Sequence, residues 1–200
     1  MKGSLVIVGF FALGIVVGLS SIVPQSLLES DVSRYALCSL MFCVGIGIGS
    51  DSEVLGSFRK VNPRLLMLPV LTIVGTLAGT AAAALVLPHR HLFDCMAIGS
   101  GFGYYSLSSI FITEYRGAEL GTIALLANIM RELLTLLCAP LLARRFGKLA
   151  PITMGGATTM DTTLPIITRA SGQDFVVVAV FHGFCVDFSV PFLVTFFCSL

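Results

Sequence analysis

Acidic side chains occur in two stretches of this chain that otherwise carry almost no charge. Glu132 lies beside Arg131 near the middle of TIALLANIMRELLTLLCAPLLA (122–143), and Asp161 lies within GGATTMDTTLPI (155–166). An ionised group at the centre of a membrane-spanning helix costs about 2.5 to 3.5 kcal/mol, and such residues usually mark ion or substrate pathways. Both carboxylates are therefore candidates for binding a cation or a proton.

The helical geometry of 122–143 separates Glu132 from its cationic neighbour. Adjacent residues on a helix point about 100° apart, so Arg131 and Glu132 are not expected to neutralise each other directly. Asn128 and Glu132 share one face, whereas Asn128, Arg131 and Thr135 share an adjoining face. We expect Glu132 to face a cavity or another element. A structural ion pair with a distant residue is the alternative.

Other polar groups have two interpretations each. A broken helix around Asp161 would expose carbonyl and N–H groups beside the carboxylate, which suits a substrate with both charges. His182 and Asp187 lie in the last apolar stretch, where His182 could relay protons; hydrogen-bonded packing is equally consistent. Tyr104 and Tyr105 could place a ring face near an ammonium group, or could simply pack against the wall.

Two apolar segments have an amino-acid composition that does not suit a simple spanning helix. Segment 95–113 contains Gly99, Gly101 and Gly103 followed by serines, and segment 151–168 contains Gly155-Gly156 and Pro165. Glycine, proline and hydroxyl side chains weaken helices. Broken backbone is tolerated at membrane depth only where protein buries it or it lines a cavity. Paired interrupted segments indicate a transporter's substrate site; close helix packing through small residues is the alternative.

The composition excludes an ordinary water-soluble domain. The chain has 200 residues, of which 56% are hydrophobic and 12% charged, with 12 Lys+Arg against 11 Asp+Glu. Soluble domains carry about 25% charged residues. A net charge of +1 gives no field for nucleic acid. The cysteines lie in apolar stretches without ligand spacing, so we expect free thiols, no metal and no cofactor.

The fold class predicted is an all-α polytopic membrane protein in one domain, 1–200. A spanning helix needs about 20 apolar residues, and about five stretches qualify: 5–23, 34–49, 65–87, 121–143 and 175–200. Segments 95–113 and 151–168 are predicted to be broken or re-entrant. We interpret 5–23 as a span rather than a signal peptide because it is long and lacks a clear cleavage site.

Loop charges favour a re-entrant first segment. If 95–113 crossed fully, the Lys and Arg residues would divide five against five; if it re-enters, they divide seven against three, with Lys2, Arg59, Lys60, Arg64, Arg144, Arg145 and Lys148 together. The positive-inside rule then places the N terminus in the cytoplasm. The tally does not decide segment 151–168. If it too is re-entrant, the C terminus lies outside.

Three motifs resemble the LysO lysine-exporter family. They are SGFGYYSLSSIFITE (100–114), NIMRELLTLL (128–137) and GGATTMDTTLPI (155–166), in that order. The resemblance implies export of L-lysine and its toxic analogues across the bacterial inner membrane, with intramembrane carboxylates at Glu132 and Asp161. Family members typically have about three more helices at the N terminus. A small partner membrane protein is expected to supply them; a different assembly, such as a homo-oligomer, or a fragment are the alternatives.

The resemblance suggests a mechanism. Exporting lysine moves positive charge against the membrane potential, so exchange with an inbound proton is the economical hypothesis. The expected substrate and proton site combines Glu132 and Asp161 with Asn128, Arg131, Ser100, Gly101, Gly103, Tyr104, Ser106, Gly155, Gly156, Thr158, Thr159, Thr162 and His182. The alternatives are a different cationic or polar amino acid, sodium coupling, a non-transporting subunit, and a membrane hydrolase. No histidine lies at motif spacing from the YYSLSS serines, which disfavours the hydrolase.

Overall fold

The computed structural model describes residues 67–87 and 90–200, together with scattered positions earlier in the chain. The chain divides into two units, Met1–Gly45 and Ile46–Leu200. In the first unit, Leu13, Val16, Tyr35 and Phe42 are among the described residues and are helical. The predicted spans 5–23 and 34–49 lie almost wholly outside the described residues.

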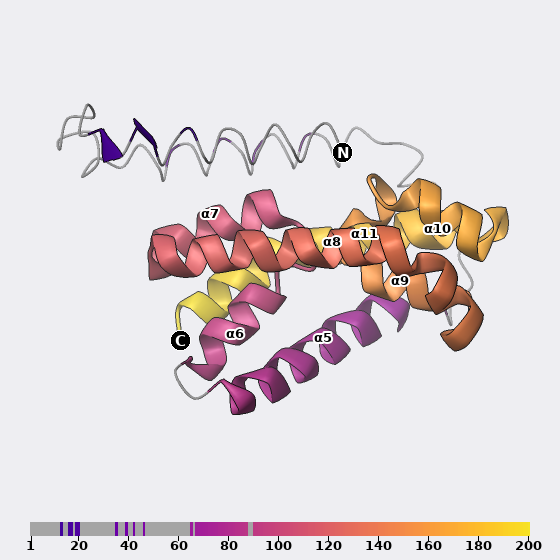
Figure 1. Ribbon diagram of the computed structural model, residues 1–200, viewed down its shortest axis with the longest axis horizontal. Helices are drawn as coiled ribbons and strands as arrows, with labels where there is room; N and C mark the ends of the chain where they lie inside the picture. The colour runs from indigo at the N-terminus through magenta and orange to yellow at the C-terminus, as the bar shows by residue number, and fades with distance from the viewer. Residues whose placement is uncertain are drawn as a thin grey trace. The chain divides into compact units, whose positions relative to one another are not determined.

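Every regular element in the described part of the second unit is a helix, which confirms the predicted all-α class (Figure 1). In chain order these elements are α5 (Met67–Val86), α6 (Leu92–Gly99), α7 (Tyr105–Arg116), α8 (Ala118–Phe146), α9 (Ala150–Gly155), the 3-10 turn η1 (Gly156–Met160), α10 (Leu164–Ser171), the 3-10 turn η2 (Gln173–Phe175) and α11 (Val176–Cys198).

Three of these helices, α5, α8 and α11, are long and apolar enough to cross a membrane. At 1.5 Å per residue, the 20 residues of α5 extend about 30 Å, the thickness of a bilayer's hydrocarbon core. Helix α8 is longer, with 29 residues, and carries Glu119 in its first turn and Arg144 and Arg145 in its last. These charges interact favourably with the helix dipole. They also make both ends of α8 polar, as the surfaces of a membrane require.

The first broken segment forms a hairpin, here called the first hairpin, made of α6, residues 100–104 and α7. Its two ends meet: the Arg116 Nε atom lies 3.8 Å from the Asp94 carboxylate. The Arg90 guanidinium donates to the Glu119 carboxylate just beyond. The chain thus enters and leaves at one end of the bundle, and the predicted break lies at Ser100–Tyr104. This is the geometry of a re-entrant segment.

The second broken segment forms a matching second hairpin, made of α9, η1, residues 161–163 and α10. The Ser171 hydroxyl donates to the Lys148 carbonyl at 2.7 Å, which ties the two ends together. Of the helix-weakening residues named for this segment, Pro165 does not make the break. It lies in the first turn of α10, where a missing N–H leaves no helical bond unmade. The helix instead breaks at Gly156, whose φ is +62°.

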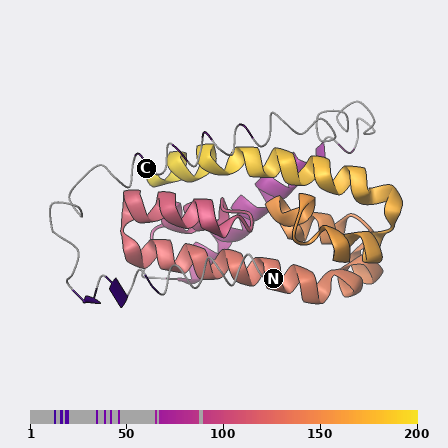
Figure 2. The ribbon, with the colours of Figure 1, turned by 90° about the horizontal axis from the view of Figure 1, so that it is seen from above.

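The two hairpins enter from opposite ends and meet between the long helices. Figure 2 shows α7 towards one end and α9–α10 towards the other, both between α8 and α11. At the meeting point the Phe102 carbonyl accepts a hydrogen bond from the Ala157 amide at 3.0 Å. Two half-length hairpins tip to tip thus occupy the length of one spanning helix.

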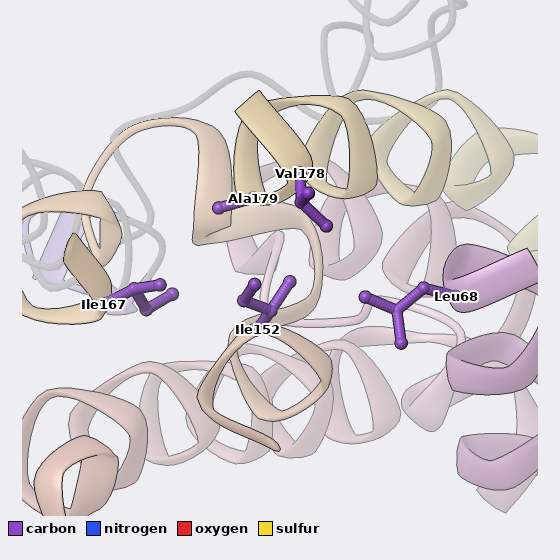
Figure 3. Close-up of a cluster of buried hydrophobic side chains, with 5 residues drawn as sticks. All are labelled: Leu68, Ile152, Ile167, Val178 and Ala179. Atoms are coloured by element: carbon purple, nitrogen blue, oxygen red, sulfur yellow. The ribbon is translucent and has the colours of Figure 1, made fainter. Parts of the chain in front are cut away.

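A cluster of buried apolar side chains anchors the base of the second hairpin (Figure 3). It comprises Leu68 of α5, Ile152 of α9, Ile167 of α10, and Val178 and Ala179 of α11. Ile152 and Ala179 are completely buried. Packing of four elements around Ile152 holds the hairpin's two arms rigidly, so that the position of its tip is defined.

Candidate functional site

The tips of the two hairpins are joined by a backbone hydrogen bond, and the Thr158 side chain lies close to Gly103. Phe102 has a φ of +45° and Gly103 a φ of +93°, which turns the chain between α6 and α7. A Cβ atom on Gly156 would overlap the Phe102 carbonyl oxygen. Glycine at 156 is therefore required both by its positive φ and by the close approach of the other hairpin.

Asn128 of α8 holds the first hairpin tip. Its Oδ1 accepts from the Gly103 amide at 2.8 Å, and its Nδ2 donates to the carbonyls of Ile98 at 3.1 Å and Ala124 at 2.9 Å. Both amide hydrogens are thus used on backbone. Asn128 satisfies groups that the break leaves unpaired, and it has no donor left for a substrate.

Arg131 holds the second hairpin tip in the same way. Its Nε donates to the Met154 carbonyl at 2.9 Å and its Nη2 to the Thr153 carbonyl at 3.1 Å. These carbonyls belong to the last turn of α9, which carries partial negative charge. The guanidinium also lies 5.7 Å from the centre of the Phe102 ring. The positive charge is balanced by a helix end, and no carboxylate among the described residues pairs with it.

Carboxylates from three elements gather beside the hairpin tips. Glu132 lies one turn beyond Asn128, is 5% exposed, and neighbours the Thr162 side chain and Asp161. Asp161, at the exposed mouth of the second tip, accepts a hydrogen bond from the Thr162 amide. Asp187 of α11 is also 5% exposed and lies within electrostatic range of Asp161. We call Glu132, Asp161 and Asp187 the carboxylate cluster.

Tyr104 completes the surroundings of the carboxylate cluster from the first hairpin. Its hydroxyl is beside Ser106 and within electrostatic range of Asp161 and Asp187. Among the described residues no three His, Cys, Asp or Glu side chains converge closely enough to hold one metal ion. The cluster is thus an extended acidic surface rather than a metal-ion cage. It suits a cation with more than one point of attachment.

The family is identified by comparison with known proteins. A family model described as "Lysine exporter LysO" matches residues 8–198. The chain belongs to the LysO lysine-exporter family. It is 35% identical to "Lysine exporter LysO" of Escherichia coli over 196 residues, 97% of this chain and 64% of that protein. The chain therefore spans about two thirds of the length of that relative. No solved structure matches it.

A second LysO-family relative is a provisionally named lysine exporter from Haemophilus influenzae. It is 33% identical over 166 residues, which is 82% of this chain and 83% of that protein. The motifs that suggested the LysO family from sequence are 100–114, 128–137 and 155–166. In the structure these three motifs are the first hairpin tip, the middle of α8 and the second hairpin tip. They contain Glu132, Asp161 and Tyr104, whereas Asp187 of the carboxylate cluster lies outside them.

In this LysO-family chain His182 is completely buried, with both ring nitrogens engaged. Nε2 lies 2.8 Å from the Thr72 hydroxyl and Nδ1 lies 3.3 Å from the Thr159 hydroxyl. The Thr159 hydroxyl directs its single proton towards the carbonyls of Gly156 and Ala179, so its oxygen can accept from Nδ1–H. This network joins α5, η1 and α11, as a packing group does.

Most of the remaining predicted site residues build the hairpin tips. The Ser100 hydroxyl donates to the Met96 carbonyl, and the Thr158 hydroxyl donates to the Gly155 carbonyl. Gly101 lies against the Asn128 amide, and Gly103 lies opposite Gly155 and Thr158. Of the predicted residues, only Glu132, Asp161, Thr162, Tyr104 and Ser106 present polar groups around the carboxylate cluster.

Sequence reasoning missed three residues at this centre. Phe102 supplies the carbonyl that joins the tips, Thr163 bonds the Thr158 hydroxyl and carbonyl, and Gly183 lies against the Met160 amide. Asp187 was noted but left without a role. One signal was available: Gly183 and Asp187 are one helical turn apart. A glycine can allow a neighbouring backbone to approach a helix closely. Where it lies one turn before a buried carboxylate, it can mark the place at which that helix passes a binding site.

A groove of about 490 Å³ lies between α5, α8 and α9. Apart from threonines at 72, 76 and 153 its lining is apolar, with side chains such as Leu71, Leu142 and Phe146. Thr76 also faces the Arg131 guanidinium, at 3.4 Å from Nη1. None of the carboxylate cluster lines this groove. The groove is thus distinct from the carboxylate cluster.

Proposed function

We propose that this chain forms the translocation centre of a secondary exporter of L-lysine and its analogues in the bacterial inner membrane. The carboxylate cluster at the meeting point of two re-entrant hairpins carries the proposal. Each buried carboxylate is costly at membrane depth unless a cation or a proton compensates it. No cationic side chain among the described residues pairs with Glu132, Asp161 or Asp187. A transported cation supplies that compensation.

Proton antiport is the proposed coupling. At neutral pH lysine carries two ammonium groups and one carboxylate, so its export works against an inside-negative potential at about 2.3 kcal/mol per 100 mV. One-for-one exchange with an inbound proton cancels this electrical term. The remaining pH gradient is worth about 1.4 kcal/mol per pH unit. A carboxylate that binds either a proton or an ammonium group, but not both, performs the exchange.

The proposed cycle uses the hairpins as the moving parts. Glu132 and Asp161 bind the ammonium groups, and competing protons release them on the outer side. The tips meet through the Ala157–Phe102 backbone hydrogen bond, and their movement against α8 breaks the hydrogen bonds that Asn128 and Arg131 make to them. Movement of the hairpin pair against α8 and α11 then exposes the carboxylate cluster alternately to the two sides.

The proposed orientation follows the loop charges. Arg144, Arg145 and Lys148 lie at the end where the second hairpin opens, and the positive-inside rule places that end in the cytoplasm. The first hairpin, with Arg90 and Glu119 at its base, then opens outward. The C terminus lies at this outer end too, because the Arg116 Nε donates to the Cys198 carbonyl at 3.0 Å.

Efflux from proteoliposomes loaded with labelled lysine tests the proposal. The chain is reconstituted both by itself and with a small membrane-protein partner, and an acidic external pH is imposed. We expect efflux that the pH gradient accelerates and that Glu132→Gln and Asp161→Asn each abolish. Glu114→Gln and Asp174→Asn serve as controls, since both carboxylates lie outside the cluster. Full efflux by both cluster variants would refute the proposal.

Two further arms of the same assay resolve the coupling and the substrate. Efflux that follows a sodium gradient and ignores pH would replace the proton with sodium. Counterflow with a panel of cationic and polar amino acids identifies the substrate. If lysine produces no counterflow while another amino acid does, the substrate is that amino acid and the cluster keeps its role.

A further inference from the structure

Asp187 is a buried carboxylate without a hydrogen-bond partner. Its side chain belongs to a residue that is 5% exposed, and no hydrogen bond joins it to any residue in the described part of the chain. A buried and unpaired charge at this depth is strongly unfavourable. The proposed cycle assigns no part of the substrate to Asp187. Such a carboxylate either takes up a proton or is compensated by a cation, and no cationic side chain in the described part of the chain pairs with it.

The packing of α11 determines where Asp187 points. Gly183, one turn earlier on the same face, admits the second hairpin so closely that a Cβ atom there would lie 2.7 Å from the Met160 amide nitrogen. Side chains four residues apart on a helix lie one above the other. Asp187 therefore lies beside the next residue of the tip, Asp161, with which it interacts electrostatically.

Asp161 is the carboxylate that links the other two. It interacts electrostatically with Glu132 and with Asp187. Asp161 is exposed, whereas Glu132 and Asp187 are buried. Among the described residues these carboxylates do not form a group that could hold one metal ion. Carboxylates on three separate elements can instead bind two cationic groups of one substrate.

We propose that Asp187, together with Asp161 and Tyr104, binds the side-chain ammonium of a dibasic amino acid, while Glu132 and Thr162 bind its α-amino end. This inference rests on the proposed function and specifies which part of the substrate each carboxylate recognises. The α end also carries a carboxylate, which needs a donor. The Thr162 hydroxyl bonds the cluster carboxylates in this structure and can turn to the substrate carboxylate once ammonium groups occupy the cluster. The side-chain ammonium carries no negative group and fits beside Asp187, where Tyr104 offers a ring face as well.

This assignment makes Asp187 a specificity-determining residue for the terminal charge. An analogue that replaces the side-chain ammonium with a hydroxyl, 6-hydroxynorleucine, keeps the α end and the chain length. Binding such an analogue leaves Asp187 uncompensated in the wild type. Asp187→Asn removes that penalty and also removes the attraction for lysine.

The test measures how well lysine and 6-hydroxynorleucine compete with labelled lysine in counterflow by proteoliposomes. We expect the wild type to prefer lysine, and Asp187→Asn to lower the ratio of the two half-inhibitory concentrations by about tenfold or more, as loss of a charge-assisted hydrogen bond predicts. Asp174→Asn, at an exposed carboxylate of η2 just before α11, is the matched control and should leave the ratio unchanged.

A second variant tests the same assignment while keeping the charge. Asp187→Glu extends the side chain by one methylene. Ornithine, which is one methylene shorter than lysine, should therefore compete more effectively in counterflow relative to lysine. An unchanged lysine-to-hydroxynorleucine ratio in Asp187→Asn, or an unchanged lysine-to-ornithine ratio in Asp187→Glu, overturns the inference while wild-type lysine counterflow upholds the proposed function. Absence of lysine counterflow in the folded wild type overturns both.

Discussion

Asn128 and Arg131 lie one turn apart on α8, and each holds the tip of a different re-entrant hairpin. Asn128 bonds the backbone of the first hairpin at Gly103 and Ile98, and Arg131 bonds that of the second at Thr153 and Met154. One short stretch of α8 thus fixes the positions of both hairpin tips. Glu132 follows immediately, so the residue proposed to bind substrate and the residues that position the tips share one rigid element.

Replacing Asn128 with leucine should destabilise the first hairpin. The substitution leaves the Gly103 amide and the Ile98 carbonyl unpaired in a buried place, at about 1 to 3 kcal/mol per unsatisfied group. We expect a lowered thermal unfolding temperature in detergent and loss of efflux. Thr122→Val is the control, because it removes an exposed hydroxyl from the same helix. Equal stability of the two variants would show that Asn128 does not hold the tip.

Replacing Arg131 with lysine separates a positioning role from a substrate-binding role. Lysine keeps the charge but cannot bond two carbonyls at once with a planar fork. We expect a fall in maximal efflux rate and in thermal stability with little change in the KM for lysine. A raised KM with wild-type stability would instead mean that Arg131 contacts the substrate carboxylate.

Replacing Gly156 with alanine should separate the two tips. The new Cβ overlaps the Phe102 carbonyl, and the positive φ adds strain of about 1 to 2 kcal/mol. Gly172→Ala is a matched control because its φ is +105° and its Cβ would have nothing within 4 Å. We expect Gly172→Ala to lose some stability but keep efflux, and Gly156→Ala to lose efflux as well. Similar efflux rates in the two variants would contradict tip-to-tip contact.

Replacing His182 with glutamine should leave the pH dependence of efflux unchanged. Both ring nitrogens bond threonine hydroxyls and the side chain is completely buried, so the ring acts as packing between α5 and η1. We expect lower thermal stability but the same shape of the efflux–pH profile between about pH 5 and 8, the range in which histidines titrate. A lost or displaced limb of that profile would assign His182 to the proton path.

Cysteine labelling tests the two re-entrant hairpins. In a cysteine-free background, Arg90→Cys and Glu114→Cys flank the first hairpin, and Arg145→Cys and Arg169→Cys flank the second. We expect a membrane-impermeant maleimide added to intact cells to label the first pair and to spare the second. Labelling that differs within either pair would mean that the segment crosses the membrane fully.

The sequence by itself determined the class of protein and the positions of its breaks. Long uncharged stretches can be stable only in a bilayer, and clusters of glycine, hydroxyl and proline residues weaken a helix. These are local properties, so 65–87, 121–143 and 175–200 anticipate α5, α8 and α11 closely. The family resemblance likewise follows from three contiguous motifs.

The tertiary structure decided what each polar residue contacts. Helix periodicity predicted that Asn128 and Glu132 share a face. It did not predict that the side-chain amide of Asn128 forms hydrogen bonds with the backbone of the first hairpin. It predicted that Arg131 and Glu132 point apart. It did not predict that carbonyl groups in the last turn of α9 balance the positive charge of Arg131. Asp187 lies 26 residues from Asp161 in sequence, and only the crossing at Gly183 places them together. Such partners come from other elements, and sequence spacing contains no information on contacts between separate helices.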